Sequence, residues 1–486
     1  MSEAFRGTLN KLDDFRYEIP RSYKPQMRTT GIIFADEKML PHIKGDNAPD
    51  QVANVATMPG IVGSSLAMPD IHWGYGFPVG GVAAFDLNDG VISPGGIGYD
   101  INCGVRLVRT DLDLKDVQPK VKDLIDAIFV NVPSGVGSEG KVRLSREELS
   151  KVMREGANWA VEKGYGWKED IERIEAKGCL SDADPSLVSQ KAVSRGVPQI
   201  GSLGAGNHFL EVQRVDKLYA PEAGKALGID HEGQITVMIH TGSRGFGHQI
   251  ATDYIAEHER AVRKYNITLP DMQLACAPIG SKEGDSYWKA MCCAANFAWT
   301  NRQMIVHWVR QSFEKVFNTS ADSMGMKIVY DVCHNIGKIE DHTVDGQKRR
   351  VVVHRKGATR AFPPNHPETP SMYKSVGQPV LIPGDMGSCS FVLVGLPGSM
   401  EYSFGSSCHG AGRAMSRTAA TRKYRAAEVE RDLREKGIYI KAASKAGIVE
   451  EAPGAYKNVE DVVRVAEGAG LTKIVARLVP IGVMKG

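Results

Sequence analysis

The 486-residue sequence lacks long apolar runs and a marked excess of either charge. Its 60 Lys and Arg against 57 Asp and Glu give a net charge of +3, so a nucleic-acid partner is neither required nor excluded. No apolar run approaches the roughly 18 residues of a membrane-spanning helix, and the first residues lack the apolar core of a secretory signal. Internal repeats and low-complexity segments are also missing. We therefore expect a globular cytoplasmic protein with no membrane partner.

The eight cysteines lack the regular spacing of a disulfide framework. In a chain of this length without a secretory signal, they read as reduced thiols of a cytosolic protein. The 52 glycines cluster in short groups beside polar residues, which is typical of functional loops rather than of flexible linkers. The cysteines are Cys103, Cys179, Cys276, Cys292, Cys293, Cys333, Cys389 and Cys408.

Short apolar runs bounded by glycine predict strands along most of the chain. The longest helical pattern covers residues 286–318, and another helix is expected from about 413 to 436. We expect an α+β fold with mixed or antiparallel sheets around a central cleft, and residues 1–486 acting as one catalytic unit. The predicted strands are 31–35, 79–85, 105–110, 234–240, 327–335 and 348–355, with a strand–turn–strand unit over 380–394.

Residues 113–197 differ from their surroundings and read as a helical insertion packed on one side of the sheets. A helix is expected over 119–129, where the first proline suits a helix start. Ser145-Arg-Glu-Glu148 is a capping box that opens a helix running to about Lys163. Two further helices are expected over 168–177 and 185–195.

Histidine or cysteine recurs where an apolar strand meets a glycine loop. Cys103 stands three residues after Asp100 in a glycine-rich segment, which alone could be a tight turn with a buried thiol. His208, His240 and His334 stand at similar junctions. Carboxylate, thiolate and imidazoles together suit Mn, Fe, Co, Ni or Zn, and one thiolate can bridge two ions. Ligands spread over about 230 residues favour a catalytic centre over a structural zinc site.

His409 lies in a different kind of loop, Ser406-Ser-Cys-His-Gly-Ala-Gly-Arg413. An imidazole can attack phosphorus, glycine N–H groups can hold phosphate oxygens, and Arg413 can neutralise developing charge. The alternative is a helix-start loop whose arginines face solvent. Earlier in the chain, residues 68–78 form a glycine- and aromatic-rich loop that carries Asp70 and His72.

Taken together, these motifs resemble the RtcB family of RNA-splicing ligases, over roughly residues 60–486. None of the motifs would suffice alone, but the set is specific, and no ligand or nucleophile position departs from the family pattern. They are Asp100-Ile-Asn-Cys-Gly-Val-Arg106, Gly204-Ala-Gly-Asn-His-Phe-Leu-Glu211, His240-Thr-Gly-Ser-Arg-Gly-Phe-Gly-His248, Asp331-Val-Cys-His-Asn335, His354-Arg-Lys-Gly-Ala-Thr-Arg360, Pro383-Gly-Asp-Met-Gly-Ser388 and Cys408-His-Gly-Ala-Gly-Arg413.

The resemblance implies a GTP- and Mn²⁺-dependent ligase with two Mn²⁺ per site. It would join RNA ending in a 2′,3′-cyclic phosphate or 3′-phosphate to RNA with a 5′-hydroxyl, in tRNA splicing and RNA repair. The intermediates would be a guanylylated His409 and an RNA-(3′)pp(5′)G end. tRNA halves are the substrates that the family suggests, and an archease-type activator is a further partner to test.

The resemblance also implies roles for individual residues. His409 would be the nucleophile, with Arg413 on the phosphate. Cys103 would bridge the metals, with His208 on one ion and Asp100, His240 and His334 on the other. The nucleotide pocket would contain Asn207, Phe209, Glu211, His334, Asn335, Pro383, Gly384, Asp385, Met386, Ser390, His409, Gly410, Ala411, Gly412, Arg413, Tyr456 and Lys485. Candidate RNA contacts are Arg106, Arg244, Arg355, Lys356, Arg360 and Arg417, which would bind electrostatically.

Two other functions use part of the same pattern. A dinuclear metal phosphodiesterase that hydrolyses RNA ends would need the metal cluster but not His409. A metal-bearing RNA- or nucleotide-binding protein would need basic grooves but no nucleophile. The loop around His409 argues against both.

Overall fold

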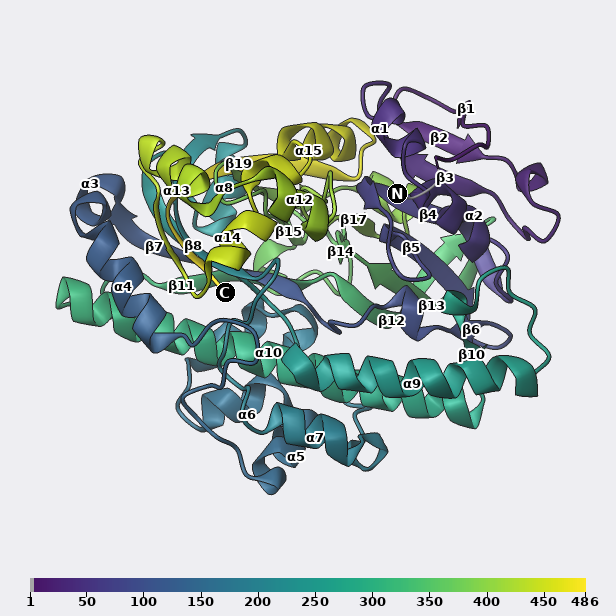
Figure 1. Ribbon diagram of the computed structural model, residues 1–486, viewed down its shortest axis with the longest axis horizontal. Helices are drawn as coiled ribbons and strands as arrows, with labels where there is room; N and C mark the ends of the chain where they lie inside the picture. Colours follow the sequence, from purple (N-terminus) through teal and green to yellow (C-terminus); the bar gives the residue numbers. More distant parts are fainter. Residues whose placement is uncertain (1–3) are drawn as a thin grey trace.

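The computed structural model describes residues 4–486 and has the α+β architecture that the sequence predicts (Figure 1). Paired strands are antiparallel throughout the described residues except for β3–β4 and β18–β19, so the sheets are mixed. The eight-stranded sheet runs β11 (Lys327–Cys333), β7 (Gly104–Asp113), β9 (Gln234–Thr241), β8 (Phe209–Leu218), β19 (Thr472–Lys485), β16 (Ser390–Gly395) and β15 (Pro379–Ile382), with β18 (Tyr439–Ala442) beside β19. The seven-stranded sheet runs β1 (Asn10–Lys11), β2 (Arg16–Ile19), β3 (Gly31–Phe34), β4 (Ile61–His72), β5 (Val79–Asp86), β13 (Gln347–Lys356) and β12 (Asn335–Val344).

Two long helices, α9 (Arg244–Lys264) and α10 (Lys282–Phe317), run along one side of the sheets (Figure 1). The largest apolar cluster joins α10 to the eight-stranded sheet and the insertion, and fully buried Trp299 lies in it. The remaining helices are α1 (Leu40–Lys44), α2 (Ala48–Val55), α3 (Leu114–Val117), α4 (Val121–Asn131), α5 (Arg146–Glu155), α6 (Ala157–Glu162), α7 (Gln190–Gly196), α8 (Pro221–Leu227), α11 (Pro397–Tyr402), α12 (Arg417–Lys423), α13 (Ala426–Glu435), α14 (Lys445–Glu450) and α15 (Val459–Gly468). Two-stranded sheets pair β6 (Val91–Ile92) with β10 (Ala277–Pro278), and β14 (Ala358–Arg360) with β17 (Ser406–Cys408).

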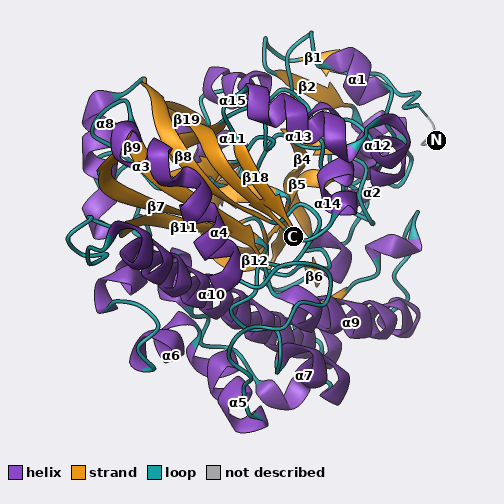
Figure 2. Cartoon of the chain, turned by 60° about the vertical axis from the view of Figure 1, so that its left-hand side comes forward, coloured by secondary structure: helices purple, strands orange, loops and turns teal. Residues whose placement is uncertain are grey.

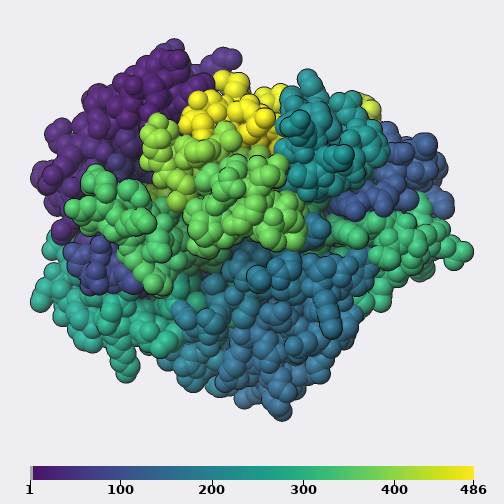
Figure 3. Space-filling view, turned by 180° about the vertical axis from the view of Figure 1, so that it is seen from behind, coloured from purple at the N-terminus to yellow at the C-terminus, as the bar shows by residue number. Residues whose placement is uncertain are grey.

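The helical insertion is confirmed, and α4 lies within two residues of the helix predicted over 119–129. The other predicted helices are broken, shortened or replaced by turns, and the helices do not share one packing surface. The capping box at Ser145 forms, yet the helix breaks at Gly156, whose φ of +58° suits glycine. A side chain there would meet the carbonyl oxygen of Gly178 at 2.0 Å. Residues 168–173 form a 3₁₀ helix rather than an α-helix, and residues 175–178 form a turn in which Ala176 and Lys177 have positive φ. Helices α5 and α6 pack on α10 and α7 on α9, whereas α4 also packs on β18 and β19. In Figure 3 the blue residues of the insertion cover the lower middle of this face of the molecule.

Several elements differ from the prediction outside the insertion. Residues 61–72 are strand, so Asp70 and His72 lie at the end of β4 rather than in a loop. The helix expected over 413–436 is two helices, α12 and α13, separated at Tyr424 and Arg425. Helix α9 and strand β19 were not expected at all, although β19 lies near the middle of the larger sheet (Figure 2).

Four neighbouring strands bring the predicted metal ligands to one edge of the larger sheet. Gly104, which opens β7, pairs with Thr241 of β9 on one side and Cys333 of β11 on the other. Phe209, which opens β8, pairs with His240. Because these pairs are antiparallel, the start of one strand lies beside the end of the next. The register therefore places residues from across the chain at a single edge.

Candidate metal and nucleotide site

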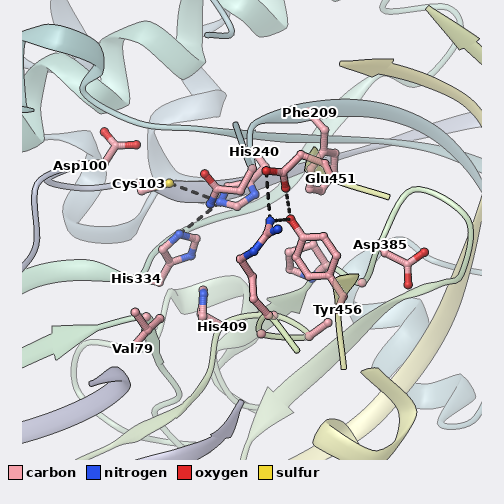
Figure 4. A pocket seen from close by; sticks show the side chains of 18 of the residues that line it. Val79, Asp100, Cys103, Phe209, His240, His334, Asp385, His409, Glu451 and Tyr456 are labelled. Carbon is pink, nitrogen blue, oxygen red and sulfur yellow. Dashed lines mark hydrogen bonds and ion pairs between the residues drawn. The ribbon is translucent and has the colours of Figure 1, made fainter. Parts of the chain in front are cut away.

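Cys103 lies at the centre of the cluster that the strand ends build (Figure 4). Its Sγ is 3.5 Å from Nε2 of His208 and 3.3 Å from Nε2 of His240. Nε2 of His240 is in turn 3.2 Å from Nε2 of His334, and Nε2 of His208 is 2.8 Å from Oδ2 of Asp100. All five predicted ligands therefore meet at one place.

The ligands fall into two groups that share Cys103. One contains Asp100 and His208, and the other contains His240 and His334. This differs from the predicted allocation, in which Asp100 joined His240 and His334. Asp100 is held on the His208 side because its other oxygen, Oδ1, accepts a hydrogen bond from the backbone N–H of Ser243 at 3.0 Å.

The protonation of the cluster suits a cation. Burial lowers the pKa of His240 and His334 far below the usual range, so both imidazoles are neutral ligands. Burial alone would raise the pKa of Asp100, but the hydrogen bond and charge of His208 bring it to about 2. Burial, with the charge of Asp100, raises the pKa of the Cys103 thiol, and a metal ion would favour the thiolate. The donor set fits borderline divalent ions.

His409 lies directly beside this cluster, although it comes from the other side of the cleft. It follows β17, and its ring centroid is 4.9 Å from that of His334. Its Nδ1 is 2.6 Å from Oδ2 of Asp70, and the same oxygen accepts the backbone N–H groups of His409 and Gly410 at 3.0 and 3.3 Å.

Asp70 fixes which nitrogen of His409 can react. The carboxylate is fully buried, and the charge and hydrogen bonds of His409 keep the pKa of Asp70 low although burial opposes this. A carboxylate accepts, so Nδ1 carries the proton and Nε2 keeps its lone pair. The sequence singled out Asp70 without giving it a role. The signal was a carboxylate in a glycine- and aromatic-rich stretch, but its contact with residue 409 is visible only in three dimensions.

A cavity of about 280 Å³ joins the cluster to His409 and contains most of the predicted nucleotide-binding residues. Ser390 does not line it but lies behind the wall, where its Oγ accepts the N–H of Gly384 at 3.4 Å. Lining residues given no role by the sequence include Val79, Tyr99 and Glu451. The predicted lining residues are Asn207, Phe209, Glu211, His334, Asn335, Pro383, Gly384, Asp385, Met386, His409, Gly410, Ala411, Gly412, Arg413, Tyr456 and Lys485.

Two buried ionisable groups line the part of the cavity formed by β8 and β19. Burial raises the pKa of Glu211 to about 8, so this carboxyl group is largely protonated at neutral pH. Burial lowers the pKa of Lys485, whose Nζ donates to the carbonyl oxygen of His208 at 3.1 Å and lies 5.7 Å from the ring centroid of Phe209. Lys485 is therefore part of a central strand and not of a loose tail.

Comparison with known proteins agrees with this geometry. The family model described as tRNA-splicing ligase RtcB matches residues 51–486. The chain belongs to the RtcB family. It is 58% identical to tRNA-splicing ligase RtcB of Thermococcus kodakarensis, over 98% of this chain and 99% of the relative. The proteins of the same name from Archaeoglobus fulgidus and Nanoarchaeum equitans are 56% and 51% identical, with at least 98% of each chain covered.

The six basic residues predicted to bind RNA in this RtcB-family chain separate into two sets. Arg106, Arg355 and Arg360 are buried and paired with carboxylates, which corrects their assignment as RNA contacts. Arg106 Nε donates to Asp331 at 2.6 Å, and Arg355 makes two hydrogen bonds of 2.8 Å to Glu340. These pairs hold strands together in the interior.

The other three basic residues lie at the site. Arg244 Nη1 is 3.4 Å from Nδ1 of His208, while Lys356 and the half-exposed Arg417 line the cavity. Burial lowers the pKa of Lys356 to about 7, and its Nζ donates to the carbonyl oxygen of Phe77 at 3.0 Å. We found no helix within residues 4–486 that combines the length and apolar character needed to cross a membrane.

Proposed function

We propose that this chain is an RNA ligase of tRNA splicing that uses GTP and two Mn²⁺ ions to join 3′-phosphate or 2′,3′-cyclic phosphate ends to 5′-hydroxyl ends. The observation that carries the proposal is the hydrogen bond between Nδ1 of His409 and Asp70, which leaves Nε2 as a nucleophile beside a cluster of metal ligands. The names of the relatives support the same class of reaction.

His409 begins the reaction in this proposal. Its Nε2 attacks the α-phosphorus of GTP, a P–N bond forms, and the bond to the bridging oxygen breaks, releasing pyrophosphate. The imidazole gains positive charge in this step, and the carboxylate of Asp70 stabilises it. Gly412 lies in the same turn and lines the cavity, so its N–H group can bind the phosphate, whereas the N–H of Gly410 is held by Asp70.

Two RNA steps follow. Water opens a 2′,3′-cyclic end to a 3′-phosphate, whose oxygen then attacks the phosphorus on His409, breaks the P–N bond and forms RNA-(3′)pp(5′)G. The 5′-hydroxyl oxygen of the second RNA attacks the 3′-phosphorus and expels GMP, so a 3′,5′-phosphodiester is formed. Half-exposed Arg417 and Arg244 beside His208 would bind RNA phosphates in this proposal. Lys356 lines the cavity as well, but its Nζ would have to leave the carbonyl oxygen of Phe77 to do so.

The metal ligands would hold two Mn²⁺ ions, one at Asp100 and His208 and one at His240 and His334, with Cys103 between them. Bound there, the ions would supply Lewis-acid stabilisation of phosphoryl oxygens. The chain itself supplies neutral imidazoles, a thiol that can ionise, and the nucleophile. An archease-type activator, a cytoplasmic location and the action of residues 1–486 as one catalytic unit stay predictions.

The test is the mass of the intact protein after incubation with GTP and Mn²⁺, compared with His409→Ala. The wild-type chain should gain the mass of one GMP, lost in acid and retained in base, as expected of a P–N bond. His409→Ala should bind Mn²⁺ but gain nothing. A metal-loaded wild-type chain that forms no adduct with GTP or ATP would favour a phosphodiesterase, and ligation by His409→Ala would exclude the nucleophile assignment.

A further inference from the structure

Glu451 is a buried carboxylate that lines the nucleotide cavity. It follows α14, its side chain is 1% exposed, and it lines the same cavity as His409 and Tyr456 (Figure 4). A charge buried to this degree needs close partners to offset the loss of hydration. Its partners therefore indicate what it does.

Three side chains of the cavity donate hydrogen bonds to this one carboxylate. Oε1 accepts from Nη1 of Arg413 and from Nε of Arg417, both at 3.2 Å. Oε2 accepts from the hydroxyl of Tyr456 (Figure 4). Burial would raise the pKa of Glu451, but the positive charges of Lys485, Arg413 and Arg417 lower it, so the carboxylate is ionised.

These hydrogen bonds connect two separate parts of the chain. Arg413 ends the loop that carries His409, whereas Tyr456 lies beyond α14, and the two residues also form a backbone bridge. Helices α13 and α14 have a small apolar cluster of their own, which packs on Met386 of the cavity wall and on Val483 of β19. Glu451 is thus the polar link between this cluster and the loop of the nucleophile.

Arg413 is oriented by two backbone carbonyl groups and by Glu451, whose carboxylate is the charged partner of its guanidinium. Its Nε donates to the carbonyl oxygen of Met415 at 3.0 Å, and its Nη2 donates to that of Glu450 at 2.8 Å. Nη1 donates to Glu451 and also lies 3.4 Å from the hydroxyl of Tyr456. The guanidinium is therefore fixed before any nucleotide arrives.

We propose that Glu451 is a positioning residue for GTP, because it holds Arg413 and Tyr456 in the arrangement that binds the nucleotide. The inference rests on the proposed function. Glu451 does not contact the nucleophile and acts through its partners, so its main effect is on nucleotide affinity. Groups fixed in advance lose less entropy on binding, and affinity rises accordingly.

The experiment compares Glu451→Gln with Glu450→Gln in formation of the GMP adduct. Gln keeps the size of the side chain but removes its charge and one acceptor oxygen. We expect Glu451→Gln to raise the KM for GTP about tenfold or more, as for a lost charged hydrogen bond, with the maximal rate within about threefold of wild type. Glu450 is the matched control, since its carboxylate is 34% exposed and 4.0 Å from Arg417, and its substitution should leave KM unchanged.

Two results would overturn the proposal. One is an unchanged KM in Glu451→Gln. The other is a loss of activity that is explained by a lower melting temperature, with KM unchanged in the protein that remains folded. That result would mean that Glu451 has a purely structural role. If Glu451→Gln does not fold, Tyr456→Phe removes the other end of one hydrogen bond, and it must raise KM for the proposal to stand. A wild-type chain that forms no adduct would instead defeat the proposed ligase function.

Discussion

The two walls of the cleft are built in opposite ways. The sheet wall, made of Cys103, His208, His240 and His334, stands at strand ends fixed by the register of four neighbours. The loop wall, made of His409, Arg413, Glu451 and Tyr456, comes from turns and short helices. Each wall is nevertheless fixed by a buried ionic group behind it, which shows how a loop can be held as firmly as a strand.

The sheet wall is supported by the guanidinium of Arg302 on α10. Its Nη1 donates to the carbonyl oxygens of Asn102 and Thr241, at 2.8 and 2.9 Å. These two residues are the chain neighbours of the predicted metal ligands Cys103 and His240. The Nε and Nη2 of Arg302 donate to Asp331 at 2.8 and 2.9 Å. In the loop wall the buried supporting groups are negative instead: Asp70 accepts a hydrogen bond from His409, and Glu451 accepts one from Arg413.

The largest effect should come from the support of the loop wall. Asp70→Asn keeps an oxygen that can accept from Nδ1 and from the backbone N–H groups of His409 and Gly410, but it removes the negative charge that stabilises the imidazolium formed during attack. We expect the rate of adduct formation to fall on the order of 10³-fold, while Mn²⁺ binding stays within about twofold. Single-turnover labelling with GTP and calorimetric Mn²⁺ titration measure the two quantities. Equal losses in both would mean that the walls are not independent.

A substitution in the sheet wall should have the opposite effect, with weaker Mn²⁺ binding and an intact loop wall. Cys103→Ala removes the one group shared by both ligand sets, so we expect Mn²⁺ affinity to fall at least 100-fold, with loss of ligation. The hydrogen bond of His409 to Asp70 should persist, and ring NMR signals of His409 can report on it. If Cys103→Ala binds two Mn²⁺ ions with unchanged affinity, Cys103 is not a ligand shared by the two ions.

The sheet wall was easier to predict than the loop wall for a physical reason. Each metal ligand has a local signature, a strand that runs into glycine, so the residues could be found one by one. Which of these residues lie together in one ligand group could not be predicted, because this depends on the hydrogen bond between Ser243 and Asp100. Glu451 has no signature at all, since its partners come from separate turns. The buried arginines were misassigned because an arginine in a strand looks basic until its carboxylate partner is known, as with Arg106 and Asp331.

A third prediction uses pH to probe the sheet wall at β8. The pKa of Glu211 is about 8 in the folded chain against an ordinary value of 4.5, so the unfolded chain loses this proton first. Stability from this group should therefore fall as pH rises from about 4.5 to 8 and then level off. Glu211→Gln cannot titrate, so its melting temperature relative to wild type should rise by roughly 2 °C or more between pH 5 and pH 8. A constant difference would show that Glu211 is ionised when folded.

The smallest effect is expected at the rim of the loop wall. Arg417 is half-exposed, and among residues 4–486 only Glu450 and Glu451 lie within ion-pair distance of it. Arg417→Ala should weaken RNA binding about threefold at moderate salt and reduce the slope of log affinity against log salt by about one. Arg355 cannot serve as the control position for this experiment, because its side chain is buried in the interior. Filter binding over a salt series decides the point, and an unchanged slope would show that Arg417 does not contact phosphate.

Strand β19 has a consequence for how the molecule is made. It lies between β8 and β16 in the larger sheet, and it carries Lys485 to the cavity. Strands β8 and β16 precede it in the chain, so they leave the ribosome with their pairing edges open. The nascent chain must keep these edges from other partners until β19 arrives, because unpaired edges invite association between chains. The cavity is therefore complete only after that strand closes the sheet.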